Sequence, residues 1–203
     1  MEAKNTALIL IGYQNDYFAE DGILREVVDE SSKVTGVLEN TVALLEEWGD
    51  KLVISTPIIF TPDYSELKEP VGILKTIMEV GAFKQGSKGS ETIPEIKQFG
   101  DFIFEVPGKQ GLNAFINTDL EKILREHKIE EVLLAGTVCS ICIDSTGRSA
   151  FEKGFKVTML SDCISGRTVF EQEFYCDKVF PLYAAVADSK SIARDLELES
   201  EAI

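Results

Sequence analysis

Cys142 is the residue of this sequence that could take part in the widest range of reactions. The segment 136–142 reads GTVCSIC and follows an apolar run that predicts a buried strand. A helix is expected after it, with Cys142 at or near its N-terminus, where backbone N–H groups and the helix dipole lower a thiol pKa. The same N–H groups can hold a developing oxyanion. A buried cysteine can also serve as a small hydrophobic residue, so position alone leaves both interpretations open.

Two further arrangements have chemical interpretations. Cys139 and Cys142 match a C-x-x-C redox motif, although Cys139 is expected in the turn before the helix rather than at its start. Lys109 follows another expected strand and could hold a neighbouring thiolate or polarise a substrate. A single lysine in a loop is more often a solvated surface group. Without further pattern, Cys142 and Lys109 are therefore candidates only.

Histidine chemistry is largely excluded. The chain has one histidine, His127, in the last turn of an expected helix, where a basic side chain suits the helix dipole. One histidine rules out every multi-histidine metal site. The cysteines are Cys139, Cys142, Cys163 and Cys176. Because the sequence shows no export signal, we expect them to be free thiols rather than a disulfide framework.

The composition limits the class of partner. The 203 residues include 20 Lys and Arg against 35 Asp and Glu, a formal net charge of −15. A chain this acidic repels phosphate backbones and anionic membranes, so we expect no nucleic acid and no membrane as partner. The apolar run Ala7–Ile11 is too short to span a bilayer. We expect a single domain over residues 1–203, located in the cytoplasm.

Short apolar runs alternate with helical patterns along the chain. Strands are expected at Ala7–Ile11, Leu52–Ile59, Asp101–Val106, Glu131–Ala135, Phe155–Leu160 and Ala184–Ala187. Helices are expected at Ser31–Trp48, Thr118–His127, Cys142–Lys153 and Glu171–Tyr183. This alternation predicts an α/β fold with a mostly parallel six-stranded sheet flanked by helices on both faces.

The predicted sheet indicates where a site should lie. Ligands of such sheets bind outside the carboxyl ends of the strands. Those ends are expected in the segments 12–18, 58–65, 107–111 and 136–142. The less regular segment 61–100 could be a lid or an oligomer contact.

Three ordered motifs give the chain a resemblance to a known family. The first strand continues as ALILIGYQNDYF, similar to an apolar strand followed by D-x-Q-x-D-F. Lys109 stands six residues before the phenylalanine of Asn113-Ala114-Phe115, similar to a lysine before S-A-F, and Thr118-Asp119-Leu120 matches T-x-L. Gly136, Cys142-Ile143 and Gly154-Phe155-Lys156-Val157 resemble G-x-x-T-x-x-C-V followed by G-[YF]-x-V. From about Ala7 to Ile192 the chain resembles isochorismatase-like cysteine hydrolases, which include nicotinamidases, carbamoylsarcosine and biuret amidohydrolases, and isochorismatases.

The resemblance implies a three-layer fold and a set of roles. Cys142 would be the nucleophile and Lys109 the lysine of a catalytic triad. The backbone N–H groups of Val138 and Cys142 would form the oxyanion hole, and a cis peptide would join Thr137 to Val138. Tyr17 would be an aromatic wall for a planar substrate, with Gly12 and Phe60 also at the substrate. A homodimer or higher homo-oligomer would be the usual assembly.

Two departures from the family pattern matter. The triad aspartate of D-x-Q falls at Gly12, which removes the usual proton acceptor. Asp16 matches the family's second, structural aspartate, and Asp63 or Glu105 could offer a carboxylate instead. Nicotinamidases also carry Asp-x-His near the end of the second strand, where this chain has Ile58 and Phe60. Those side chains cannot bind a metal, so we expect no metal and no other cofactor.

These considerations leave three functional hypotheses. The first is a metal-independent cysteine hydrolase of a small amide, ureido or carbamoyl substrate, acting through a Cys142 thioester. The second is a catalytically impaired family member that binds a ligand or forms a complex, favoured by Gly12. The third is an isochorismatase-type vinyl-ether hydrolase, which would still need an acid. Retention of both Lys109 and Cys142 favours the enzyme.

Overall fold

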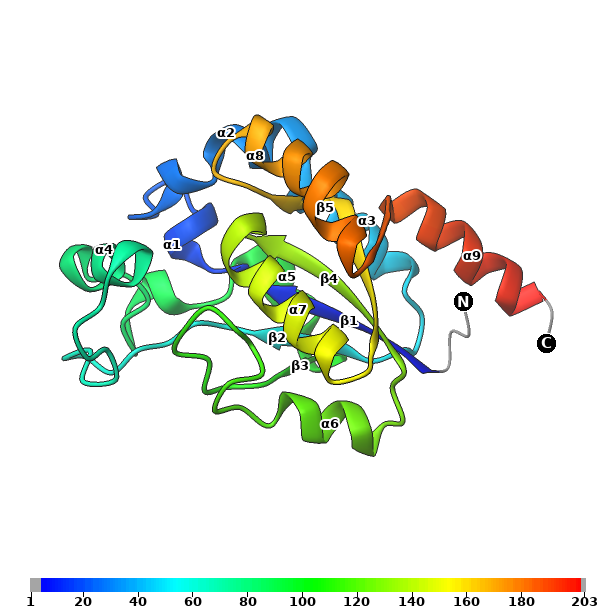
Figure 1. Ribbon diagram of the computed structural model, residues 1–203, viewed down its shortest axis with the longest axis horizontal. Helices are drawn as coiled ribbons and strands as arrows, with labels where there is room; N and C mark the ends of the chain where they lie inside the picture. The colour runs from blue at the N-terminus through cyan, green and yellow to red at the C-terminus, as the bar shows by residue number, and fades with distance from the viewer. Residues whose placement is uncertain (1–4, 202–203) are drawn as a thin grey trace.

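The computed structural model, which describes residues 5–201, has a six-stranded sheet with helices on both faces (Figure 1). The strands are β1 (Thr6–Ile11), β2 (Val53–Thr56), β3 (Ile103–Glu105), β4 (Glu131–Thr137), β5 (Lys156–Ser165) and β6 (Ala185–Ala187). Their order in the sheet is β3-β2-β1-β4-β5-β6, and every neighbouring pair is parallel. The predicted α/β class and six-stranded sheet are confirmed.

The helices connect successive strands, as a parallel sheet requires. The α-helices are α1 (Asn15–Phe18), α2 (Asp29–Thr35), α3 (Val37–Glu47), α4 (Gly72–Val80), α5 (Pro94–Lys97), α6 (Leu120–Glu126), α7 (Asp144–Glu152), α8 (Val169–Phe174) and α9 (Ser189–Glu201). The 3₁₀ and π turns are η2 (Arg25–Val27), η3 (Lys88–Ser90), η4 (Gly100–Phe102), η5 (Cys139–Ile143), η6 (Tyr175–Val179) and η7 (Phe180–Leu182).

Strand β1 lies in the middle of the sheet and is buried on both faces. Its odd-numbered residues, including Ile9 and Ile11, belong to a core that contains side chains of α6 and α7. Its even-numbered residues Leu8 and Leu10 belong to a second core with side chains of α3, α5 and α9. Because successive strand side chains point to opposite faces, one apolar run supports both helical layers.

Two predicted helices differ from the observed ones. The expected helix Ser31–Trp48 is two helices, because Gly36 adopts a left-handed conformation (φ 65°) that ends α2 before α3 begins. The expected helix Glu171–Tyr183 starts as α8 and then passes through the π turn η6 and the 3₁₀ turn η7. Pro181 lies in η7, and a proline disrupts a regular helix because it has no backbone N–H to donate.

The segment 61–100 contains regular structure that its sequence pattern did not predict. Ile93 and Ile96, at α5, belong to the core on one face of the sheet. Helix α4 lies at the side of the molecule toward which the strands point (Figure 1). A role of this segment as lid or oligomer contact stays a prediction. Within the described residues 5–201, no helix is long and apolar enough to cross a bilayer.

The buried side-chain amide of Gln14, just beyond β1, forms hydrogen bonds with two segments that are distant in the sequence. Its Nε2 donates to the carbonyl oxygens of Ile58 (2.7 Å) and Ser90 (2.8 Å), and its Oε1 accepts from the Ile58 N–H (2.8 Å). Its side chain is buried, so these bonds are protected from competing water. Gln14 therefore fixes the chain beyond β2 against the chain beyond β1.

We expect Gln14→Ala to lower the free energy of unfolding by about 3 kcal/mol, because it leaves three buried backbone groups without partners. Urea denaturation measures this change. Gln98→Ala is the matched control, since the Gln98 amide also bonds a carbonyl (Glu95, 2.7 Å) but is exposed. The control should change stability by less than about 0.5 kcal/mol. Equal losses in the two variants would contradict this role of Gln14.

Candidate active site

The structure brings Lys109 and Cys142 into direct contact. The Lys109 Nζ lies 3.4 Å from the Cys142 Sγ. Lys109 is 0% exposed and Cys142 is 2% exposed, so the contact lies inside the protein. The two residues are 33 positions apart in the sequence. The candidates that the sequence offered separately therefore form one buried pair of a thiol and an amine.

The loop that carries Lys109 is held from two sides. Lys109 forms an isolated parallel bridge with Ile58, and the Ile59 N–H donates to the Lys109 carbonyl (3.3 Å). Further along the loop, the Ala114 N–H donates to the Thr146 Oγ1 of α7 (3.1 Å). Since Gln14 fixes Ile58, the position of Lys109 depends indirectly on that amide.

Lys109 lies in an environment that disfavours its charge. Its Nζ donates to the Gly111 carbonyl oxygen (2.5 Å) as well as contacting Cys142. Burial lowers the pKa of Lys109 below its usual value, and the neighbouring Cys142 only partly offsets this effect. Within the described part of the chain, no carboxylate forms an ion pair with Lys109.

The local backbone around Cys142 differs from the prediction. Cys142 lies within the π turn η5, and α7 begins only at Asp144. Cys142 therefore lies near the helix N-terminus, as expected, although the expected helix Cys142–Lys153 begins two residues later than predicted. The Ile141 and Ile143 N–H groups donate to the Val138 carbonyl (3.0 and 3.2 Å), and the Thr137–Val138 peptide is cis. An oxyanion hole at the Val138 and Cys142 N–H groups stays a prediction.

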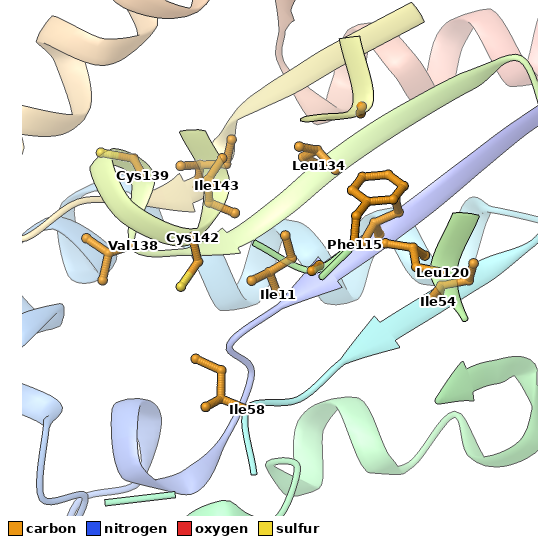
Figure 2. Packing of buried hydrophobic residues seen from close by; sticks show 14 of the residues in the cluster. Ile11, Ile54, Ile58, Phe115, Leu120, Leu134, Val138, Cys139, Cys142 and Ile143 are labelled. Carbon is orange, nitrogen blue, oxygen red and sulfur yellow. The ribbon is translucent and has the colours of Figure 1, made fainter. Parts of the chain in front are cut away.

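Cys139 does not share the site of Cys142. The two side chains leave opposite sides of the turn, and the Cys142 sulfur points toward the side where Ile58 lies (Figure 2). Burial and the nearby Glu171 carboxylate raise the pKa of Cys139 well above its usual range. The four cysteines are free, as expected. This arrangement does not favour a C-x-x-C redox pair, because the second thiol points away from the first.

Glu171 supports the turn η5 from α8, a role that no pattern in the sequence indicated. It accepts from the Arg167 N–H (2.6 Å) and from the Arg167 Nε (2.9 Å). Burial would raise the pKa of Glu171, but hydrogen bonds from Arg167 and Ser140 lower it overall. Ser140 lies in η5, so an ionised Glu171 connects the turn that carries Cys142 to the chain beyond β5.

Tyr17 lies beside the pair and is uncharged. It belongs to α1, is 2% exposed, and its ring centroid lies 4.9 Å from that of Phe83. Burial and the neighbouring Cys142 raise the pKa of Tyr17 well above its usual range. The phenol therefore stays protonated and can donate a hydrogen bond. Its assignment as an aromatic wall of the substrate site stays a prediction.

Gly12 lies against Thr137, the last residue of β4. Its φ is +78°, and a Cβ added there would lie 2.8 Å from the Thr137 carbonyl oxygen and 3.1 Å from the Thr137 Cγ2. Both conditions oppose a side chain at this position. The Cδ2 of Tyr17 would lie 3.6 Å from the same Cβ. The space beside Gly12 is thus closed by Thr137 and Tyr17.

The other carboxylates considered for the site lie elsewhere. Asp16 accepts from the Phe83 N–H (2.6 Å), which fits the structural role expected for it. Asp63 is bound by Thr61 (2.9 Å) in an exposed loop. Glu105 is exposed and lines a cavity that neither Lys109 nor Cys142 lines. None of these residues forms a hydrogen bond with Lys109 or Cys142 in the described structure.

Comparisons with known proteins identify the family of the chain. A family model described as the isochorismatase domain matches residues 6–191. The chain belongs to the isochorismatase family. Nicotinamidase 3 of Arabidopsis thaliana is 25% identical over 96% of this chain and 90% of its own length. A ureidoacrylate amidohydrolase of Variovorax paradoxus is 27% identical over 93% and 81%. A cysteine hydrolase from Pseudomonas syringae pv. phaseolicola has the same fold, with a TM-score of 0.85, 18% identity and coverage of 97% and 94%.

Within this isochorismatase fold, the end of β2 is apolar. Ile58 is 2% exposed, and Phe60 is 0% exposed with its ring centroid 5.5 Å from that of Tyr64. Among the described residues, no group of three His, Cys, Asp or Glu could hold a metal ion. His127 ends α6, and its Nδ1 lies 3.0 Å from the Ile123 carbonyl oxygen, in agreement with its expected helix-end role.

A cavity of about 390 Å³ lies outside this site. It is lined by side chains beyond β2 and β3 and by the segment around η3, including Pro57, Ile59 and Glu105. Neither Lys109 nor Cys142 lines it. The cavity and the contact between Lys109 and Cys142 are therefore separate features of this isochorismatase-family protein.

We expect Cys142 to react with iodoacetamide at pH 7 roughly ten-fold or more faster than the other three cysteines. The reason is that Lys109 can stabilise the Cys142 thiolate or accept the proton of the thiol. Burial opposes ionisation of the others, raising the pKa of Cys176 to about 11 and that of Cys163 to about 12. A time course with peptide mass readout measures all four. A Cys142 rate no higher than that of Cys176 would contradict the assignment of Cys142 as a nucleophile.

Proposed function

We propose that this isochorismatase-family protein hydrolyses a small C–N substrate of the amide, ureido or carbamoyl class through a thioester on Cys142. The observation that carries the proposal is the buried 3.4 Å contact between the Lys109 Nζ and the Cys142 Sγ. A thiol and an amine in contact inside a protein can form a nucleophilic thiolate. The names of the nicotinamidase and ureidoacrylate amidohydrolase relatives support the C–N class.

In the proposed reaction, the Cys142 sulfur attacks the substrate carbonyl carbon. The N–H groups of Val138 and Cys142 would stabilise the oxyanion, and the amine would leave to give the thioester. Water would then attack the thioester and release the acid. We also propose that the reaction uses no metal, because the side chains of Ile58 and Phe60 have no donor atoms at the end of β2.

A second candidate function is ligand binding without turnover. It is favoured by Gly12, because no carboxylate stands where the family has its usual proton acceptor. The low exposure of Cys142 also agrees with it. A vinyl-ether hydrolase of the isochorismatase type is less well supported, since that reaction also needs an acid and no carboxyl group of residues 5–201 forms a hydrogen bond with the pair.

The test is hydrolysis of a panel of small amides, ureido acids and N-carbamoyl compounds, followed as ammonia or amine release. We expect Cys142→Ala to lower the rate on any accepted substrate by about 10³-fold or more. Cys176→Ala is the matched control and should keep its rate, because Cys176 contacts Gln172 and not the pair. A metal chelator should change the hydrolysis rate of neither the native protein nor Cys176→Ala. Panel-wide inactivity with intact folding would favour the binding function.

We further propose a cytoplasmic homodimer or larger homo-oligomer. The four free, buried thiols are compatible with a reducing compartment. Phe170 and Phe174 of α8 are 75% and 46% exposed and stack on each other at 6.0 Å, which gives this helix an apolar surface suited to a second copy. Sedimentation equilibrium should give a multiple of 22.5 kDa. A monomer at micromolar concentration would contradict the assembly.

A further inference from the structure

Among residues 5–201, no carboxylate forms a hydrogen bond with Cys142 or Lys109 and could accept a proton there. Gly12 has no side chain, and a Cβ at that position would lie 2.8 Å from the Thr137 carbonyl oxygen. Asp16 is committed to the Phe83 N–H, and Asp63 is committed to the Thr61 hydroxyl in an exposed loop. If Cys142 is to become a thiolate, another group must take its proton.

Lys109 is the basic side chain in contact with that thiol. Its side chain is 0% exposed, and within the described structure its Nζ contacts the Gly111 carbonyl oxygen and the Cys142 sulfur. A buried ammonium without an anionic partner is costly, so such a lysine favours its neutral form. A neutral amine has a lone pair that can accept a proton. The burial effect on the pKa of Lys109 acts in the same direction.

The other titratable group that faces the pair does not compete for this role. Tyr17 comes from α1, and burial together with Cys142 raises its pKa, so it remains a neutral phenol. The neighbouring Asp16 carboxylate also raises the pKa of Tyr17, and it accepts a hydrogen bond from the Phe83 N–H. Asp144 at the start of α7 bonds Arg148 (2.9 Å) and Tyr183 (2.9 Å) instead.

We propose that Lys109 is the general base of this protein, so that a Cys142–Lys109 dyad takes the place of a carboxylate-containing triad. This inference rests on the proposed hydrolase function and specifies its proton transfers. Activation of a cysteine by a lysine alone requires direct contact between the two side chains. The structure has this contact, because the Lys109 Nζ lies 3.4 Å from the Cys142 sulfur.

The proton and electron pairs balance over one turnover. The Lys109 amine takes the proton of the Cys142 thiol, and the thiolate forms a C–S bond to the substrate carbonyl. The resulting ammonium gives that proton to the departing nitrogen as the C–N bond breaks. In the second half, Lys109 takes a proton from the attacking water while a C–O bond forms. The C–S bond then breaks, and the proton returns to the Cys142 sulfur.

The experiment uses alkylation of Cys142 by iodoacetamide in the full chain, which needs no known substrate. We expect Lys109→Ala to slow alkylation at pH 7 by about ten-fold or more. Added methylamine should restore much of the rate, and the restored part should rise with pH as more of the amine becomes neutral. Guanidinium at equal concentration should not restore it, because it supplies charge but accepts no proton.

Equal recovery with guanidinium and methylamine would overturn the proposal, since Lys109 would then act only as a fixed positive charge. Unchanged alkylation in Lys109→Ala would overturn it as well. Lys109→Met, which keeps an unbranched apolar stem, controls for folding, and thermal unfolding of both variants shows whether they remain native. Lys109→Met should be as slow as Lys109→Ala without added amine.

A second variant tests the absent carboxylate directly. Gly12→Asp should not raise the alkylation rate or any hydrolysis rate, because its side chain would meet Thr137 at a left-handed backbone position. Gly12→Ala controls for the steric effect. A rate gain in Gly12→Asp but not in Gly12→Ala would show that a carboxylate fits beside Gly12, and would contradict the argument that the closed space there leaves Lys109 as the base.

The outcomes separate this inference from the proposed function. Selective amine rescue of alkylation with no hydrolysis of any panel compound would support the dyad and contradict the amidohydrolase. Hydrolysis that depends on Cys142, without selective amine rescue in Lys109→Ala, would support the amidohydrolase and contradict Lys109 as its base.

Discussion

The site depends on one physical constraint, the burial of a lysine amine against a thiol. Lys109 is completely buried, and a carbonyl oxygen and a sulfur atom accept its hydrogen bonds. Such a position costs free energy unless the amine is held in place and its charge is controlled. The loop bonds through Ile58 and Ala114 provide the first condition. The lowered pKa of Lys109 reflects the second.

The sheet explains how distant residues reach this contact. β4 neighbours β1, and β1 neighbours β2, so the turns beyond these three strands leave the same edge. η5 brings Cys142 from β4, α1 brings Tyr17 from β1, and the chain beyond β2 brings Ile58 to the loop of Lys109. Gln14 joins two of these turns through buried hydrogen bonds. The parallel order of the sheet is thus the reason that the site exists at one edge.

Local sequence patterns predicted the strands and the family better than the turns. The apolar run of β1 and the motif around Cys142 are short-range signals, and both lie where they were expected along the chain. The break at Gly36 and the π turn before α7 were missed, because helical spacing of apolar residues continues across both. The partners of Gln14 and Glu171 lie far away in the sequence, so no local pattern could reveal them. Side-chain contacts of that kind are decided by tertiary packing.

Glycine at position 12 has consequences for charge as well as for shape. A carboxylate beside a buried lysine compensates an ammonium and stabilises it, whereas removing the carboxylate leaves the ammonium without a counter-ion. With no carboxylate at position 12, burial favours the neutral amine of Lys109, and a neutral amine can itself accept a proton. Thr137 and Tyr17 close the space beside Gly12, so an aspartate at this position would require the turn that leads to Cys142 to move. The glycine at position 12 and the proposed role of Lys109 as the base therefore depend on each other.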